Sequence, residues 1–263
     1  MLNDFDMITH DFNQTIKVYP ISDVHYGALE HCSKDWLEFC KKVEKSPDTY
    51  LILNGDLINN SVKSCKFANP FDELVRPREQ KKKMVEFLEP IKDRILCATS
   101  GNHEGRSLRE SDIDITYDIM AKLDIEDLYR PNACYMKVSL GHRKRDNTPM
   151  QSYTFCVTHG AGGGGSTGAM INKNEKFGNL HDGLDCLIVG HHHKGATTKP
   201  SKILIDRKNN KVTFPHYTML STVSWLNYGG YALRAMLQPA YVADPQQLTL
   251  HMNQHRKWIE TRW

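Results

Sequence analysis

Short apolar runs alternate with amphipathic segments through the first half of the chain. The apolar runs predict buried strands that end in polar residues, at 17–23, 49–56 and 94–104. The segments between them predict helices over 33–45 and 78–93, the first with Trp36, Phe39, Cys40 and Val43 at helical spacing. Strand, helix and strand in this order favour parallel pairing with right-handed crossovers, and therefore an α/β fold.

Another helix is predicted over 112–124, where Ser111 and Asp114 could form a capping box. The second half of the chain is richer in strands. Residues 134–140 and 152–160 flank a polar, basic connection and predict an antiparallel pair. Further strand signals lie at 186–193, in a hairpin over 202–214, and at 246–254. Since no internal repeat or Pro/Ser-rich linker divides the chain, residues 1–263 are expected to form a single domain.

Composition narrows the class of protein. The chain has 263 residues, of which 40% are hydrophobic, with 34 Lys+Arg against 31 Asp+Glu and a formal charge of +3. Such a chain can bury a core and is not disordered. The small charge argues against bulk attraction to nucleic acid or anionic lipid. The sequence has no run of apolar residues long enough for a membrane helix. Because its first residues are acidic and polar, we expect no secretory signal. Seven widely spaced cysteines without a C-x-x-C pair predict a reducing, cytoplasmic setting.

The chain has 13 histidines, and several of them converge with acidic residues at predicted strand ends. The strand ends read Asp23-Val24-His25, Gly55-Asp56, Gly101-Asn102-His103-Glu104, His159-Gly160 and Gly190-His191-His192-His193. Ligands in α/β sheets bind outside the carboxyl ends of the strands. Oxygen and imidazole donors without thiolate suit manganese, iron, zinc or nickel. The sequence therefore predicts a metal site at the edge of the fold where the carboxyl ends of these strands meet.

The ordered set D-x-H, G-D, G-N-H-E, H-G and G-H-x-H resembles the calcineurin-like metallophosphoesterase superfamily. The resemblance extends over residues 18–193. It implies two packed β-sheets flanked by helices, a four-layer αββα sandwich, in which 194–263 completes the second sheet. It also implies a hydrolase of phosphoester bonds.

Carried over to this chain, the resemblance implies a two-metal centre. Asp23, His25 and His193 would hold the first ion, Asp56 would bridge the two ions, and the second ion would be completed by Asn102, His159 and His191. His103 would face the leaving group as the catalytic histidine. Residues i and i+2 of an extended strand end project to the same side, so His191 and His193 can reach neighbouring ions. His192 is then expected to point away.

Two divalent ions, with manganese favoured, would hold a bridging hydroxide and polarise the phosphoryl oxygens. Arg106 and Arg109 directly follow this motif, and a guanidinium fork suits a phosphate oxygen pair. They could equally be solvated surface arginines. The Gly-rich stretch 160–168 could be a substrate loop, a close-approach turn or plain flexible sequence, and no G-K-[ST] follows it.

The function favoured by these patterns is a metal-dependent phosphodiesterase, including a nuclease acting on DNA or RNA. Basic segments at 76–83 and 142–145 could add contacts to a nucleic-acid backbone. The alternatives are a phosphomonoesterase, a mononuclear zinc hydrolase, and a non-catalytic binding protein on the same fold. The substrate partner is a phosphoester in each catalytic reading, no membrane partner is expected, and the sequence leaves the oligomeric state open.

Overall fold

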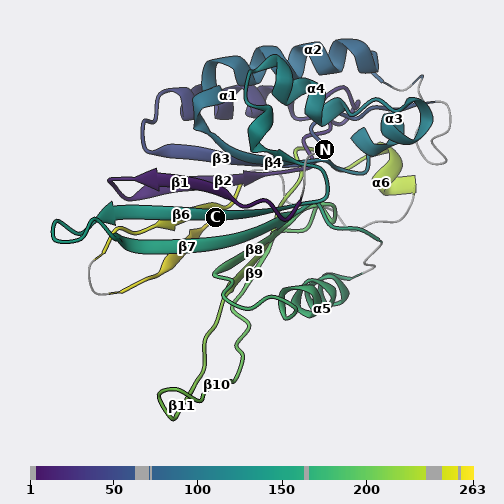
Figure 1. Ribbon diagram of the computed structural model, residues 1–263. Helices are drawn as coiled ribbons and strands as arrows, with labels where there is room; N and C mark the ends of the chain where they lie inside the picture. The colour runs from purple at the N-terminus through teal and green to yellow at the C-terminus, as the bar shows by residue number, and fades with distance from the viewer. Residues whose placement is uncertain (1–3, 63–70, 72, 163–165, 235–244, 254–255) are drawn as a thin grey trace.

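Two six-stranded sheets lie face to face at the centre of the molecule, with helices outside each of them (Figure 1). The computed structural model describes residues 4–62, 71, 73–162, 166–234, 245–253 and 256–263. The four layers are helix, sheet, sheet and helix, so the predicted αββα sandwich is confirmed.

The first sheet is mixed. Its strands, in spatial order, are β1 (Ile8–Phe12), β6 (Ala133–His142), β7 (Pro149–Thr158), β8 (Cys186–Val189), β12 (Thr218–Ser221) and β9 (Ala196–Thr198). The predicted antiparallel pair β6–β7 is present, and β7 runs parallel to β8.

The second sheet contains the strands of the first half of the chain. Their order is β14 (Ile259–Arg262), β13 (Gln247–Leu250), β2 (Ile16–Ile21), β3 (Thr49–Asn54), β4 (Ile95–Thr99) and β5 (Tyr129–Arg130). Strands β2, β3 and β4 are parallel, as their alternation with helices predicted.

Three helices cover the outer face of the second sheet: α1 (Ser33–Glu44), α2 (Pro77–Leu88) and α4 (Ile115–Lys122). The apolar side chains of α1 that recur at helical spacing are all buried there. Helix α5 (Thr167–Gly178) covers the first sheet, where Ile171 and Phe177 pack beside Leu187 and Met219. The short helices α3 (Glu104–Ser111) and α6 (Gly230–Arg234) lie toward the end where the parallel strands finish.

The core between the sheets draws on both of them. Val18 and Ile52 of the second sheet pack in one buried cluster with Val138, Phe155 and Ile188 of the first. Side chains buried on both faces explain why these strands are nearly continuous apolar runs. The six cysteines among the described residues are free and buried, and Cys65 lies outside that set.

Several boundaries differ from the sequence prediction for local reasons. Helix α2 ends at Leu88, and residues Glu89–Arg94 form a 3₁₀ segment (η2), because Pro90 lacks the N–H that an α-helix requires. The predicted capping box is wrong: Asp114 caps α4 by accepting from the Tyr117 N–H at 3.0 Å, whereas Ser111 ends α3. A second 3₁₀ segment, Glu126–Leu128 (η3), precedes β5.

Residues after 193 are divided among three places, so the expectation that 194–263 as a whole completes the second sheet is wrong. Strands β9 and β12 join the first sheet, and β13 and β14 join the second. The predicted hairpin is present as β10 (Leu204–Asp206) and β11 (Lys211–Thr213), which project away from the sandwich (Figure 1). They pair with each other and with no other described strand. No helix in the described part of the chain is both long and apolar enough to span a membrane.

Candidate metal centre

Five strand ends meet at one edge of the sandwich and carry its buried polar side chains. Strands β2, β3 and β4 end there from the second sheet, and β7 and β8 end there from the first. The residues that follow them are Asp23, Asp56, Asn102, His159 and His191, of which Asp23, Asp56 and His159 are almost fully buried. The sequence prediction that these residues share one edge agrees with their positions.

The first group of side chains contains Asp23, His25 and His193. His193 Nε2 lies 3.1 Å from Asp23 Oδ1 and 3.1 Å from His25 Nε2, and His25 Nε2 lies 3.7 Å from Asp23 Oδ1. Three donor atoms therefore converge on one point. Asp23 Oδ1 is buried and has no hydrogen-bond partner among the described residues.

The second group contains Asp56, Asn102, His159 and His191. His159 Nε2 lies 3.2 Å from Asp56 Oδ2 and 3.1 Å from Asn102 Oδ1. His191 Nδ1 lies 2.7 Å from the same Asn102 oxygen. Asp56 Oδ2 is also 3.9 Å from His25 Nε2, so this single oxygen faces both groups.

The donor set fits divalent cations. Asp23–His25–His193 and Asp56–His159–His191 are each close enough to hold one ion, and a third grouping, His25–Asp56–His103, overlaps both. A buried carboxylate oxygen without a proton donor is costly unless a cation compensates its charge. Imidazole and oxygen donors without thiolate are suitable for manganese, iron, zinc or nickel.

The backbone at this edge adopts a conformation that side chains other than glycine rarely take. Asp23, His25, Asp56, His191 and His193 have φ of 53°, 49°, 52°, 70° and 57°. The expectation that His191 and His193 follow an extended strand end is therefore wrong, because β8 stops at Val189. Left-handed residues cluster at functional sites because the surrounding fold maintains a geometry that is unfavourable locally.

Two glycines allow the loops to approach each other. Gly55 has a φ of +76°, and a Cβ there would lie 2.6 Å from the backbone nitrogen of Gly101. A Cβ on Gly101 would lie 2.1 Å from Asp56 Oδ1. The G-D and G-N-H-E motifs therefore need their glycines to bring Asp56 beside Asn102.

Glu104 has a role that the sequence did not reveal. Its carboxylate is buried and accepts hydrogen bonds from the N–H groups of Asp56 at 2.9 Å, Gly101 at 3.1 Å and Ile58 at 3.2 Å. It thereby ties the loop after β3 to the loop after β4. The Glu of the G-N-H-E motif was the only sign of this role in the sequence. Its hydrogen-bond partners, the backbone N–H groups of the two loops, come together only in the folded protein.

His159 is oriented by a neighbour that the sequence also did not reveal. Its Nδ1 lies 2.7 Å from the carbonyl oxygen of Asn54, so Nδ1 donates and Nε2 faces Asp56. The Asn54 side chain donates to the Thr158 carbonyl at 3.0 Å and accepts from the Thr99 hydroxyl at 2.8 Å. Asn54 therefore connects β3 with both β4 and β7.

The electrostatics of the edge follow from burial among opposite charges. Burial alone would raise the pKa of Asp56, but the surrounding histidines, His159 first, hold it well below its ordinary value. Burial alone would lower the pKa of His159, and Asp56 and Asp23 instead raise it to about 10. Burial raises the pKa of Glu104 to about 7, and the charge of Asp56 acts in the same direction.

His103 lies beside the first group rather than within the second. Its ring centroid is 4.3 Å from that of His25, and its backbone N–H donates to Asp56 Oδ1 at 2.8 Å. Nδ1 lies 2.6 Å from the Asn59 carbonyl, so it carries the proton, and Nε2 accepts from Arg106 Nη2 at 2.9 Å. Burial lowers the pKa of His103 well below its usual range, so the ring is neutral.

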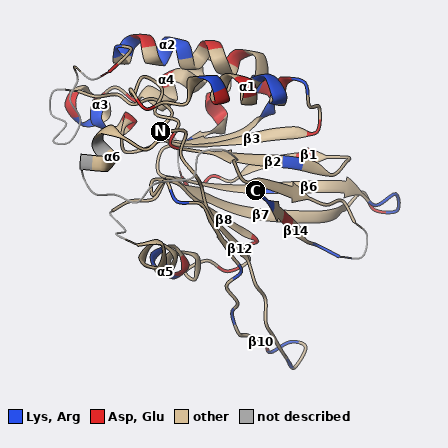
Figure 2. Ribbon diagram, turned by 180° about the vertical axis from the view of Figure 1, so that it is seen from behind, with Lys and Arg blue, Asp and Glu red and all other residues tan. Residues whose placement is uncertain are grey.

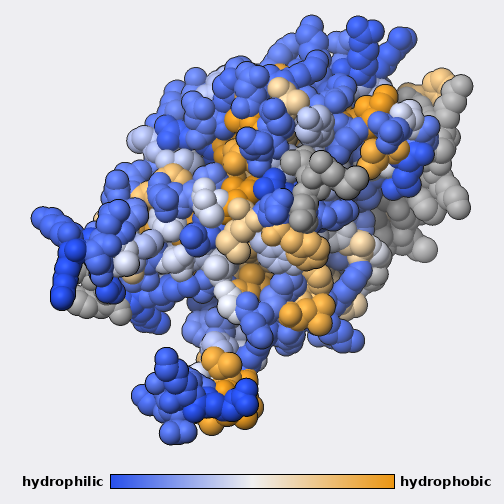
Figure 3. All heavy atoms as spheres, in the orientation of Figure 1, coloured by the Kyte–Doolittle hydropathy of each residue, from blue (hydrophilic) through white to orange (hydrophobic). Residues whose placement is uncertain are grey.

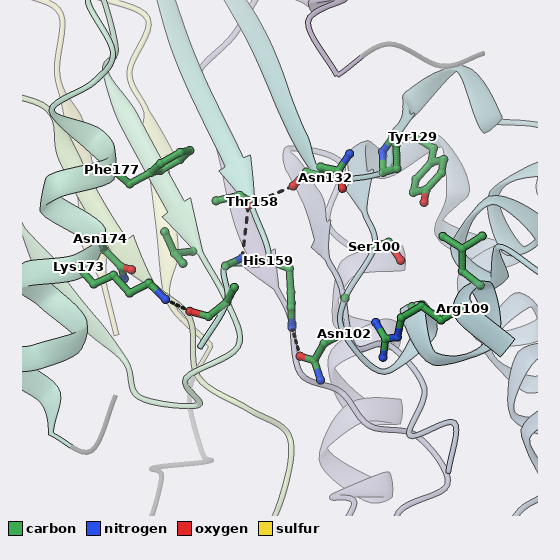
Figure 4. Close-up of a pocket in the computed structure, with 17 residues that line it drawn as sticks. Ser100, Asn102, Arg109, Tyr129, Asn132, Thr158, His159, Lys173, Asn174 and Phe177 are labelled. Carbon is green, nitrogen blue, oxygen red and sulfur yellow. Dashed lines mark hydrogen bonds between the residues drawn. The ribbon is translucent and has the colours of Figure 1, made fainter. Parts of the chain in front are cut away.

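A pocket of about 550 Å³ opens beside the second group (Figure 4). Asn102 and His159 line it, with Arg109 from α3 on one side and Lys173 and Phe177 from α5 on the other. Arg109 thus lies next to the candidate metal centre, while Arg106 binds His103 and the Asn59 carbonyl instead. Of the Gly-rich stretch 160–168, Gly160 and Ala161 line the pocket, Thr167 already belongs to α5, and 163–165 lie outside the described residues.

Two further histidines, His192 and His216, lie outside the donor groups of the described residues. His192 packs at 5.3 Å from the His191 ring, and its Nε2 is buried without a hydrogen-bond partner among the described residues. In the described part of the chain, His192 belongs to none of the groups that could hold an ion. His216 is exposed at the base of the β10–β11 hairpin, away from the strand-end edge.

The fold and the strand-end donors define a metal-binding α/β sandwich of the phosphoesterase class. The family model of the calcineurin-like phosphoesterases matches residues 16–195, and the chain belongs to this family. It is therefore a metal-dependent phosphoester hydrolase by family.

Two solved structures match this chain over most of its length at low sequence identity. A predicted phosphoesterase from Streptococcus pneumoniae TIGR4 is 12% identical, with 94% of this chain and 88% of that chain covered and a TM-score of 0.37. A metallophosphoesterase from Sphaerobacter thermophilus is 15% identical, with 94% and 89% covered and a TM-score of 0.41. A search of curated proteins gave no match.

Proposed function

We propose that this protein hydrolyses phosphodiesters at a pair of divalent metal ions. The first ion would be held by Asp23, His25 and His193, the second by Asn102, His159 and His191, with Asp56 between them. The convergence of Asp56 Oδ2 toward both groups, at 3.2 Å from His159 Nε2 and 3.9 Å from His25 Nε2, supports the shared ligand. We also propose that residues 1–263 form one domain, since strands from both halves share one core.

When bound, two such ions supply Lewis-acid activation of water and of the phosphoryl oxygens. His103 and Arg106 are positioned to act on the leaving oxygen. The Asn59 carbonyl holds the proton of the neutral His103 ring on Nδ1, so Nε2 has no proton to donate and accepts from Arg106 instead. We infer that His103 orients the Arg106 guanidinium, which would stabilise the charge that develops on the leaving oxygen. Arg106 Nη2 contacts this same Nε2 at 2.9 Å, so a leaving oxygen arriving there meets the guanidinium.

The pocket favours a diester over a monoester. His103 lies beside His25, whereas the pocket opens beside Asn102 and His159, on the other group. A diester carries two organic substituents, one of which departs at His103 while the second stays on the phosphorus. The pocket of about 550 Å³ is large enough for that second substituent.

The basic segments suggested by the sequence give little support to a nucleic-acid substrate. On α2, Lys81 pairs with Asp118 at 2.6 Å and Lys83 with Glu86 at 2.6 Å. The basic residues 142–145 lie in the connection from β6 to β7, at the start of β7 (Figure 2). The site lies at the other end of β7. We therefore propose a diester with a compact substituent as the substrate, and polymeric DNA or RNA as the weaker alternative.

The test is a panel of phosphoesters with the manganese-loaded protein. We expect turnover of bis-para-nitrophenyl phosphate to exceed that of the mono-ester, and short dinucleotides to be cleaved better than long DNA or RNA. Metal analysis of the same sample should give two ions per chain. Monoester turnover without diester turnover would contradict the diester proposal. One ion per chain at saturation would favour a mononuclear hydrolase, and no turnover with any phosphoester would favour a binding protein.

A further inference from the structure

The β10–β11 hairpin has two faces of different chemistry. Because Ile205 pairs with Val212, the side chains two residues away, Ile203 and Phe214, lie on the same face. All four are apolar. Leu204, Asp206, Lys211 and Thr213 alternate with them on the other face, which is mostly polar.

The apolar face is open to solvent in the single chain. Ile203, Ile205, Val212 and Phe214 are 72%, 69%, 56% and 68% exposed. Figure 3 shows hydrophobic atoms gathered on the hairpin next to its hydrophilic turn. A two-stranded hairpin is marginally stable alone in water, and contiguous exposed apolar side chains are typical of an interaction surface.

We propose that this face packs against the same face of a second copy, forming a two-fold symmetric dimer through the hairpins. A surface that is apolar throughout is self-complementary, which a two-fold interface requires. Two such faces, each with four side chains about two-thirds exposed, would bury on the order of 1,000 Å² in total, the lower limit for a specific interface. The dimer is therefore expected to dissociate in the micromolar range.

The charges around the hairpin are compatible with an antiparallel arrangement of the two copies. The turn carries Arg207 and Lys208, which would repel each other if two turns met. In an antiparallel pair, each turn instead lies over the base of the partner's hairpin. There, Lys202 Nζ donates to the Asn179 carbonyl at the end of α5 and lies 3.7 Å from Asp182 Oδ1. The Asp182 side chain is otherwise fully exposed, so its carboxylate can also receive a basic turn.

The hairpin offers matched variants on neighbouring residues with opposite orientations. Ile205→Lys places a charge in the centre of the apolar face, and Leu204→Lys places the same charge on the other face, where Leu204 is 53% exposed. Sedimentation equilibrium should give a wild-type dimer whose dissociation constant rises at least about tenfold in Ile205→Lys and stays within about twofold in Leu204→Lys. A wild-type monomer at 100 µM (about 3 mg/mL), or equal effects of the two variants, would overturn the proposal.

Cross-linking of cysteine variants provides a second measurement of the assembly. The two-fold axis would pass near Ile205 and Val212, so each of these residues would lie close to its own copy. Because the cysteines among the described residues are buried, Ile205→Cys introduces an accessible thiol. Mild oxidation should give a disulfide-linked dimer for Ile205→Cys and much less for Leu204→Cys. Equal cross-linking of both variants would contradict the specific face.

Discussion

The strand-end edge and the β10–β11 hairpin depart from ordinary side-chain placement in opposite directions. At the edge, Asp23, Asp56 and Glu104 are between 0% and 1% exposed, whereas on the hairpin Ile205 is 69% exposed. Buried carboxylates and exposed apolar faces are both unfavourable in an isolated chain. The comparison fits the two proposals made above, that cations occupy the edge and that a second copy covers the apolar face of the hairpin.

The two regions also differ in how they are held. The edge is tied together from five strands and two sheets, by hydrogen bonds such as those of Glu104 and Asn54. The hairpin is joined to the sandwich only at its base. Changes at the edge should therefore affect metal binding and catalysis strongly, while changes at the hairpin should affect association and leave catalysis intact.

The largest expected effect comes from Asp56→Asn. It removes the charge of the one oxygen that faces both groups of donors, so we expect kcat/KM for a diester to fall on the order of 10³-fold. The metal content should also fall below two ions per chain, as measured by plasma mass spectrometry. Leu204→Lys on the hairpin is the control and should retain wild-type activity. Full activity of Asp56→Asn would refute the assigned centre.

An intermediate effect is expected for Glu104→Gln, which contacts no candidate ion. A glutamine has one acceptor oxygen and an NH₂ group that would face backbone N–H donors, so the loops carrying Asp56 and Asn102 should loosen. We expect metal affinity to weaken by about 10- to 100-fold, measured by titration calorimetry. Glu110→Gln, an exposed residue on the same helix, should bind metal normally. Equal affinities of the two variants would show that Glu104 does not position the site.

The smallest effect is expected for Arg109→Ala at the pocket. Arg109 is exposed at the pocket margin, so its loss should raise KM for a diester about fivefold while kcat changes less than about twofold. The matched control is Arg143→Ala, an exposed arginine at the opposite end of β7. If kcat fell and KM did not change, Arg109 would act on the reacting phosphate rather than on the retained substituent.

The positions of most donor residues at the strand-end edge could be predicted from the sequence, because each depends on a short stretch of the chain. An apolar strand followed by Asp, Asn or His places that residue at a carboxyl end whatever the rest of the fold does. The alternation of strands and helices then fixed β2, β3 and β4 as parallel neighbours. Glu104 and Asn54 escaped prediction because their partners come from loops and strands elsewhere in the chain.

The sequence alone determined the α/β class, the strand ends that carry the donor residues, and the hairpin over 202–214, because these depend on residue spacing over a few positions. Only the tertiary structure decided which donors share a point in space, that His191 and His193 reach it through left-handed backbone, and that the apolar face of the hairpin turns to solvent. Those features depend on how the two sheets pack and where the chain crosses between them. Contacts between distant segments produce no regular spacing of residues in the sequence, so they cannot be predicted from it.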